Sequence, residues 1–130
     1  MKAILHSDGG ARGNPGPAAI GIVLQLEGKD PVAIGERIGE TTNNVAEYRA
    51  LLRGLEEAKR YGVTELECRL DSELVVRQLN RVYKVRDKDL VPLFVKVWNL
   101  AQAFRSIRFL AIPRSKNREA DRLVNQALDQ

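Results

Sequence analysis

The stretch KAILHSDGGARGNPGPAAIGIVLQL, residues 2–26, decides the fold of the first part of the chain. Lys2–Asp8 and Ala18–Leu26 have the apolar and β-branched composition of strands. The segment between them is rich in glycine and proline, which excludes a helix there. The pattern predicts two antiparallel strands joined by a turn. Pro31–Ile38, which follows a connection containing Gly28, predicts a third strand of the same meander.

The hydrophobic period changes after these strands. Apolar residues recur at helical spacing from Tyr48 to Ala58, which predicts a helix of about four turns, with Gly62 where a left-handed C-terminal cap is expected. The pattern then predicts a strand, a short helix, a longer helix, a strand and a last helix: Glu65–Leu70, Ser72–Leu79, Asp89–Phe104, Ile107–Ile112 and Asn117–Leu128. We find no repeat or linker, so residues 1–130 are expected to form a single α/β domain.

The composition indicates an ordinary globular domain. The chain has 130 residues, 44% hydrophobic and 29% charged, which excludes disorder, collagen and coiled coil. Its best apolar run, residues 18–24, is far shorter than the roughly 20 residues that a membrane-spanning helix needs. The first residues do not resemble a secretory leader, and the lone Cys68 can form no internal disulfide. We therefore expect a cytoplasmic, monomeric protein without a membrane segment.

The net charge of +4 resides in one window, Arg77–Lys88. The window contains one acidic residue, Asp87, and five basic ones: Arg77, Arg81, Lys84, Arg86 and Lys88. Acidic and basic residues balance in the rest of the chain. Such a window is either a solvated face or a surface that contacts a phosphate backbone.

Four acidic residues are predicted to meet at one edge of the sheet. If the first three strands form a meander and helices cross over to the last two, strands one, three, four and five all point the same way. Asp8 then ends the first strand and Asp71 directly follows the fourth. Glu47 and Asp121 lie in the first turns of the helices that follow the third and fifth strands. Open α/β sheets bind ligands at this carboxyl edge.

Clustered carboxylates raise each other's pKa values unless cations lie between them. A site of carboxylates, without a cysteine pair or a histidine cluster, favours Mg²⁺ or Mn²⁺ over zinc. Two such ions roughly 4 Å apart can activate a water and stabilise the leaving oxygen of a phosphodiester. The four acids therefore predict nuclease chemistry.

Three of the acids also have a structural interpretation. Asn44 and Glu47 have the spacing of a capping box, Asp71 could cap the short helix, and Asp121 could complement a helix dipole. Asp8 has little structural purpose at the end of an apolar strand before a glycine-rich turn. The convergence of all four acids favours the functional interpretation.

Four strings of the sequence follow the order of motifs in a known family: SDGGARGNPGPAAIG from Ser7, TTNNVAEYRAL from Thr41, LDSELVVRQLN from Leu70 and IPRSKNREADRLVNQAL from Ile112. Together they span nearly the whole chain and resemble type 1 ribonuclease H. The resemblance implies a ribonuclease H-like five-stranded mixed sheet with helices on both faces. It also implies a metal-dependent endonuclease that hydrolyses the RNA strand of RNA/DNA hybrids and leaves 5′-phosphate and 3′-hydroxyl ends.

The resemblance also implies roles for single residues. Asp8 would bridge two metal ions, Glu47 and Asp71 would complete the ion on the leaving-group side, and Asp121 would hold the ion that activates water. Glu47 corresponds to a position that senses a ribose 2′-hydroxyl, the group that distinguishes RNA from DNA. The expected substrate-binding set comprises Gly10, Arg12, Asn14, Asn43, Asn44, Ser72, Gln78, Arg81, Lys84 and Arg86. Turn and cap chemistry is the alternative for the polar members.

The chain departs from the commoner family pattern in two places. Only Arg81–Lys88 fills the stretch in which many members carry a long basic protrusion, so the chain resembles the compact branch. Arg114 stands in the loop in which many members have a histidine. A guanidinium stays protonated, so we expect Arg114 to act electrostatically in catalysis or to be an exposed loop arginine. The only histidine, His6, is expected to pack within the sheet.

Three other functions compete with this interpretation. A hybrid or double-stranded RNA binding module could use the same fold, but four acids beside phosphates would weaken binding. A proofreading exonuclease on a related fold would carry an acid two residues after the first aspartate, where this chain has Gly10. A small structural or interaction protein is the third alternative.

Overall fold

The computed structural model describes residues 1–130 and contains five strands and four α-helices. The strands are β1 (Lys2–Ala11), β2 (Gly16–Leu26), β3 (Val32–Thr41), β4 (Glu65–Leu70) and β5 (Ser106–Ala111). The helices are α1 (Asn43–Arg60), α2 (Glu73–Leu79), α3 (Val91–Ala101) and α4 (Arg118–Leu128), the last preceded by a short 3₁₀ turn, Arg114–Lys116. The predicted order of elements is confirmed.

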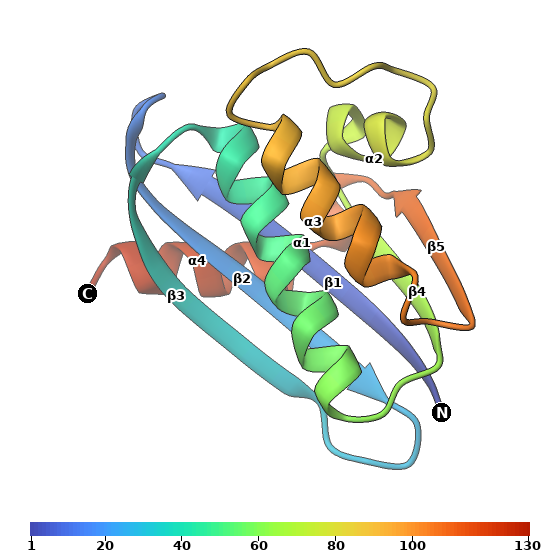
Figure 1. The fold of residues 1–130 in the computed structure, drawn as a ribbon. Coiled ribbons are helices and arrows are strands. Elements are labelled where there is room, and N and C mark those ends of the chain that lie inside the picture. Colours follow the sequence, from blue (N-terminus) through green and yellow to red (C-terminus); the bar gives the residue numbers. More distant parts are fainter.

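The strands form one mixed sheet in the order β3-β2-β1-β4-β5. The pairs β1–β2 and β2–β3 are antiparallel, whereas β1–β4 and β4–β5 are parallel. Figure 1 shows α1 and α3 on one face of the sheet and α4 on the other. The prediction of a five-stranded mixed sheet with helices on both faces is therefore correct.

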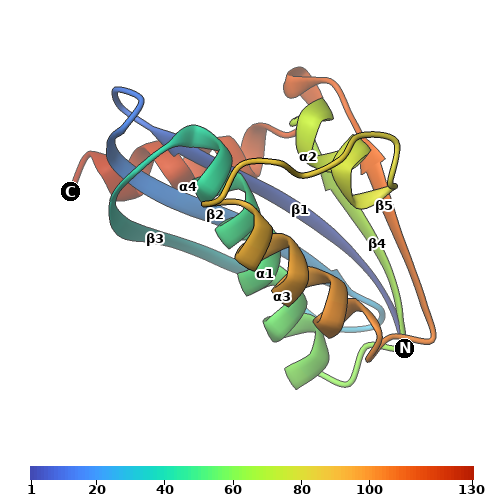
Figure 2. The ribbon, with the colours of Figure 1, turned by 45° about the horizontal axis from the view of Figure 1, so that its top comes forward.

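The main core lies between the sheet and α1, with α3 packed beside α1 (Figure 2). Leu5 and Leu24 of the sheet and Leu51 and Leu55 of α1 are completely buried. A smaller cluster joins Ala19 of β2 to the inner side of α4. Burial of these apolar faces drives the assembly of the layers. None of the helices is both long enough and apolar enough to cross a bilayer.

The first strand extends beyond its predicted end. It was expected to stop at Asp8, but β1 continues to Ala11 and pairs there with Ala18 of β2. The parallel pairing with β4 ends earlier, at Ser7 and Leu70. Asp8 therefore lies inside β1 but at the edge of the parallel part of the sheet.

Two helix starts correct the structural interpretations of the acids. Thr42 is the N-cap of α1, and its hydroxyl accepts the N–H of Val45. The capping box assigned to Asn44 and Glu47 is therefore wrong, and Glu47 lies in the second turn of α1. Ser72, whose hydroxyl accepts the N–H of Val75, caps α2 in place of Asp71. Because neighbouring hydroxyls cap both helices, the two carboxylates are free for other contacts.

The remaining predicted boundaries shift by a few residues. The third strand begins at Val32 and continues to Thr41 because β2 pairs with it to that point. The helix predicted over Asp89–Phe104 is confined to Val91–Ala101, with Pro92 in its first turn, where a missing N–H is tolerated. The last strand is Ser106–Ala111, and the last helix begins at Arg118, one residue later than expected.

Gly62 ends α1 as predicted. Its φ is 78°, a left-handed conformation that glycine adopts without strain. The N–H groups of Gly62 and Val63 donate to the carbonyl oxygens of Lys59 and Ala58. This is the Schellman pattern of a helix C-terminus.

Two glycines allow helices to approach the sheet closely, Gly9 of β1 on one face and Gly21 of β2 on the other. A Cβ on Gly9 would lie 2.2 Å from the backbone of Ala46 in α1. A Cβ on Gly21, which pairs with Asp8, would lie 2.3 Å from the carbonyl oxygen of Ala120 in α4. The residues that follow in the two helices are Glu47 and Asp121. Because neither glycine has a Cβ, both helices can place these acids near Asp8.

Candidate active site

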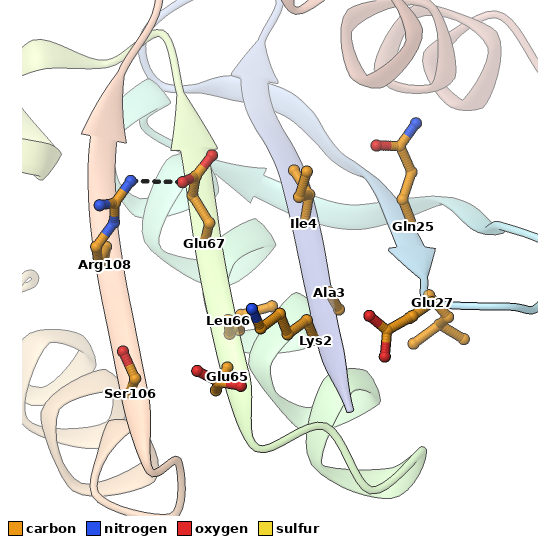
Figure 3. Close-up of a pocket in the computed structure, with 11 residues that line it drawn as sticks. Lys2, Ala3, Ile4, Gln25, Glu27, Glu65, Leu66, Glu67, Ser106 and Arg108 are labelled. Atoms are coloured by element: carbon orange, nitrogen blue, oxygen red, sulfur yellow. Dashed lines mark hydrogen bonds and ion pairs between the residues drawn. The ribbon is translucent and has the colours of Figure 1, made fainter.

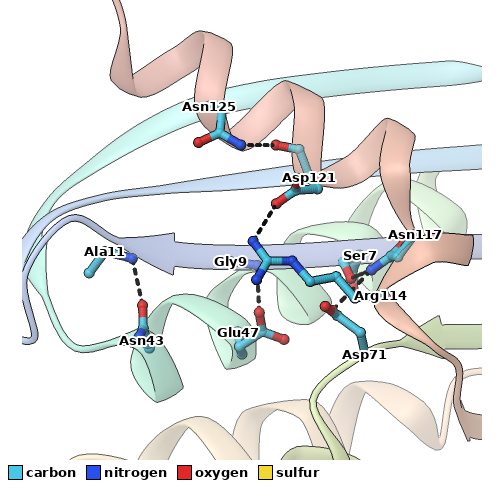
Figure 4. A network of polar contacts seen from close by, with 10 residues as sticks. All are labelled: Ser7, Gly9, Ala11, Asn43, Glu47, Asp71, Arg114, Asn117, Asp121 and Asn125. Carbon is cyan, nitrogen blue, oxygen red and sulfur yellow. Dashed lines mark hydrogen bonds and ion pairs between the residues drawn. The ribbon is translucent and has the colours of Figure 1, made fainter.

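A cleft of about 390 Å³ opens at the carboxyl edge of the parallel strands. Asp8 enters it from β1, Glu47 from α1, Asp71 from the end of β4 and Asp121 from α4. Figure 4 shows Glu47, Asp71 and Asp121 around this opening, with Arg114 between them. The structure therefore places all four predicted acids in one cleft.

Three of the acids form a compact triad. Asp8, Glu47 and Asp71 can each offer one carboxylate oxygen such that the three oxygens lie within 4.8 Å of one another. Asp8 and Glu47 are buried, and Asp71 is half-buried. The N–H of Gly9 donates to Oε1 of Glu47 at 2.9 Å, whereas Oε2 of Glu47 is buried without a partner. A buried acceptor of this kind is costly unless a donor or a cation binds it.

The environment of the triad disfavours ionisation of its acids. Burial is the main cause that raises the pKa of Asp8, and the charges of Glu47 and then Asp71 raise it further. Burial also raises the pKa of Glu47, although the proximity of Asp8 and the hydrogen bond from Gly9 oppose the shift. Removing water and adding like charges both penalise a carboxylate. A bound cation would reverse this penalty.

Asp121 lies at the rim of the cleft, outside the triad. Its Oδ1 forms an ion pair with Nη2 of Arg114 at 3.5 Å. The Arg114 side chain is 79% exposed and that of Asp121 is 33% exposed, so the pair contributes little to stability. The charge of Arg114 also counteracts the upward pKa shift of Glu47. Arg114 is therefore an exposed cation that lies near the acids.

One buried side chain that contacts the triad was missed by the sequence analysis. Asn117 is 1% exposed, and its Nδ2 donates to Oδ1 of Asp71 at 3.2 Å and to the backbone oxygen of Ser7 at 2.9 Å. From the sequence, a polar residue before a helix indicates only an N-cap. Its side chain forms no capping hydrogen bond.

The donor set of the cleft fits a hard divalent cation. The triad provides carboxylate oxygens, and no histidine or cysteine lines the cleft. The unpaired Oε2 of Glu47 offers an acceptor that no group of the protein satisfies. Oxygen ligands of this kind suit Mg²⁺ or Mn²⁺.

The predicted substrate residues near the β1–β2 turn form a linked set. Asn43 accepts the N–H of Ala11 through Oδ1 at 2.7 Å, and its own N–H donates to Oδ1 of Asn14 at 3.1 Å. Arg12 forms an ion pair with Asp129 at 2.6 Å. Gly10, Arg12, Asn43 and Asn44 line the cleft, whereas Asn14 does not.

The other predicted substrate residues follow α2 away from the cleft. Ser72 lines the cleft at the start of the helix, whereas Gln78 near its end lines a separate groove of about 560 Å³. Gln78 is buried and its Oε1 accepts the hydroxyl of Tyr48 at 2.7 Å. Arg81 and Lys84 line the same groove, and the guanidinium of Arg81 lies 5.5 Å above the ring of Trp98. Arg86 is exposed and lines neither the cleft nor the groove.

A hollow of about 580 Å³ at the opposite end of the sheet has no comparable chemistry (Figure 3). Of the three acids that line it, Glu67 forms ion pairs with Arg108 and Arg69, both at 2.6 Å. His6 lies on the same strand as Asp8 and is partly exposed, outside the carboxylate cleft. Burial, and then the charge of Arg69, lower the pKa of His6. Neither the hollow nor His6 contributes a side chain to the carboxylate cleft.

Comparison with known proteins identifies the family. A family model described as Reverse transcriptase-like matches residues 6–127. The N-terminal RNase H domain of Rv2228c from Mycobacterium tuberculosis is 44% identical, with a TM-score of 0.95 over 99% of this chain and 100% of that domain. RNase H1 from Halobacterium salinarum is 41% identical, with a TM-score of 0.94 over 99% of this chain and 98% of the other. This chain belongs to the type 1 ribonuclease H family.

A third ribonuclease H extends the comparison to a nucleic-acid complex. LC11-RNase H1, whose structure contains an RNA/DNA hybrid, is 47% identical, with a TM-score of 0.91 over 98% of this chain and 96% of the other. By sequence, the chain spans 36% of the bifunctional protein Rv2228c and 63% of the halobacterial ribonuclease HI. In the present ribonuclease H domain, residues 80–90 alone connect α2 to α3, as expected for the compact branch.

Proposed function

We propose that this ribonuclease H is a metal-dependent endonuclease that hydrolyses the RNA strand of RNA/DNA hybrids and leaves 5′-phosphate and 3′-hydroxyl ends. One observation carries the proposal: three carboxylates from three elements offer oxygens within 4.8 Å of one another in an open cleft. A pure binding module would gain nothing from buried acids beside the phosphates of a nucleic acid.

The acids would hold two divalent cations, Mg²⁺ with Mn²⁺ as a substitute. Such ions, when bound, activate a water and stabilise the leaving oxygen of the phosphodiester. Asp8 would contact both ions, Glu47 and Asp71 would complete the site of one ion, and Asp121 would hold the other. The Gly9 N–H holds one oxygen of Glu47 and leaves the other free for this purpose.

The other residues of the cleft would bind and orient the nucleic acid. Arg114 presents an exposed guanidinium at the rim, so it can hold a phosphate oxygen. Asn43 and Asn44 line the cleft beside Glu47, where a strand lying over the acids would meet them. The basic window that continues from α2 through Arg81 and Lys84 would contact phosphates farther along the duplex.

Cleavage of end-labelled duplexes tests the proposal. RNA/DNA, RNA/RNA and DNA/DNA substrates are incubated with Mg²⁺, Mn²⁺ or EDTA and resolved on denaturing gels. We expect internal cuts in the RNA of the hybrid only when metal is present. Asp8→Asn should remove cleavage in a protein that still folds. Hybrid binding without cleavage by the wild type would instead support the binding-module alternative.

The proposal also includes a monomeric enzyme of the cytoplasm. The lone cysteine, Cys68, is completely buried, and burial raises the pKa of its thiol, so it is unsuited to disulfide exchange. A reducing compartment fits this composition. Light scattering of the purified protein should give the mass of one chain.

A further inference from the structure

Asn117 joins, through its side chain, the two strands that carry Asp8 and Asp71. Its Nδ2 donates to the backbone oxygen of Ser7 at 2.9 Å and to Oδ1 of Asp71 at 3.2 Å (Figure 4). Ser7 precedes Asp8 on β1, and Asp71 directly follows β4. A single buried amide therefore connects the neighbouring strand ends that carry two acids of the triad.

The backbone of Asn117 bonds to two further residues at the rim of the cleft, Arg114 and Asp121. Its N–H donates to the carbonyl oxygen of Arg114 at 3.0 Å, and its own carbonyl accepts the N–H of Asp121 at 3.1 Å. The residue occupies the N-cap position of α4, yet its side chain does not cap the helix. Its Oδ1 is buried without a partner. The Asn117 side chain therefore bonds to Asp71 and Ser7 and forms no capping hydrogen bond with the first turn of α4.

The surroundings determine which way the amide points. The oxygens of Ser7 and Asp71 are both acceptors, so only the NH₂ end of Asn117 can face them. The amide is neutral, so it holds one oxygen of Asp71 without cancelling the charge that attracts a cation. A lysine or arginine in this place would compete with the cation for that charge.

We propose that Asn117 is a positioning residue that holds the Asp71 carboxylate in the orientation that binds a divalent cation. The inference rests on the proposed function, because that proposal assigns Asp71 to a cation site. Groups that hydrogen-bond a metal ligand orient it, and their loss typically lowers metal affinity or activity by about 10- to 100-fold. For Asn117→Ala we expect a loss of this size in Mg²⁺ affinity and in kcat, with little change in KM for the hybrid.

Asn80 provides a matched control. Its Nδ2 donates to the backbone oxygen of Phe109 at 3.0 Å, so it also joins a helix end to a strand through an amide. Unlike Asn117, it forms no hydrogen bond with an acid of the triad. Isothermal titration calorimetry would measure Mg²⁺ binding without substrate, and steady-state cleavage would give kcat and KM. Asn117→Ala and Asn80→Ala should both lower the melting temperature, but only Asn117→Ala should weaken Mg²⁺ binding.

Two results would overturn the inference. One is a folded Asn117 variant that binds Mg²⁺ as tightly as the wild type. The other is an equal loss of Mg²⁺ affinity in Asn80→Ala, which would assign the effect to general destabilisation. If Asn117→Ala does not fold, Asn117→Ser replaces it, because serine retains a favourable N-cap residue. A folded wild type that neither binds Mg²⁺ nor cleaves hybrid would overturn the proposed function instead.

Discussion

Gly9 and Gly10 are adjacent in β1, but we expect substitution by alanine to destabilise the protein only at Gly9. Neither has a positive φ, so only the space around each Cβ differs. A Cβ on Gly9 would lie 2.2 Å from the carbonyl carbon and oxygen of Ala46, whereas on Gly10 its nearest neighbour would be Cγ1 of Val124 at 3.6 Å. To reach ordinary contact near 3.4 Å, α1 would have to retreat from Gly9 by about 1.2 Å.

The cost of Gly9→Ala follows from that displacement. Overpacking typically costs about 1–3 kcal/mol. Retreat of α1 would also weaken the 2.9 Å hydrogen bond from Gly9 to Glu47, and hydrogen bonds to charged groups are worth about 1.5–3 kcal/mol. We expect Gly9→Ala to lower the free energy of unfolding by about 3 kcal/mol, or the melting temperature by about 10 °C. Gly10→Ala should stay within about 1 kcal/mol of the wild type.

Urea denaturation in EDTA, followed by far-UV circular dichroism, compares the two variants without any contribution from metal. Because Glu47 moves with α1, Gly9→Ala should also weaken Mg²⁺ binding when the metal is restored. Equal stability of the two variants, within about 0.5 kcal/mol, would refute the close approach of α1 to β1 on which the argument depends.

Three further predictions concern charge. Burial and neighbouring acids raise the folded-state pKa of Asp8, so the metal-free protein loses stability as pH rises above the unfolded pKa of about 4. In EDTA, Asp8→Asn should therefore be at least as stable as the wild type at pH 8 and should lose less stability than the wild type between pH 5 and 8. Denaturation curves that show a steeper loss for Asp8→Asn would contradict this. Arg114→Ala should change the free energy of unfolding by less than about 0.5 kcal/mol and slow single-turnover cleavage moderately, far less than Asp8→Asn does. Arg114→His should add an inflection at pH ~6.5 to the pH–rate profile. Single- and multiple-turnover rates of Arg114→Ala that equal those of the wild type would make Arg114 a passive surface residue. Arg81→Ala with Lys84→Ala should reduce the slope of log K against log salt by about 1.5 with little effect on the saturated rate, and an unchanged slope would leave these residues as a solvated face.

Much of the site could be predicted because its chemistry depends on the order and direction of elements. Hydrophobic periodicity and turn residues are local signals, and they predicted five strands, four helices and their sequence correctly. Crossover rules then placed Asp8, Glu47, Asp71 and Asp121 at one edge, and the cleft contains all four. The roles of single substrate residues were not predictable in this way, since Asn14 and Asn43 bond to each other and Gln78 bonds to Tyr48.

Strand direction follows from connectivity, so the order of residues is enough to predict which acids share the cleft. Their arrangement inside the cleft depends on how the elements pack. Thr42 and Ser72 cap α1 and α2, not the neighbouring Asn44 and Asp71, because packing decides where each helix begins. The tertiary structure placed Asp121 beside Arg114 and outside the triad. It also directed Asn117 to Asp71, a contact across 46 residues that no local pattern encodes, because side-chain direction at a helix start depends on the strands packed against it.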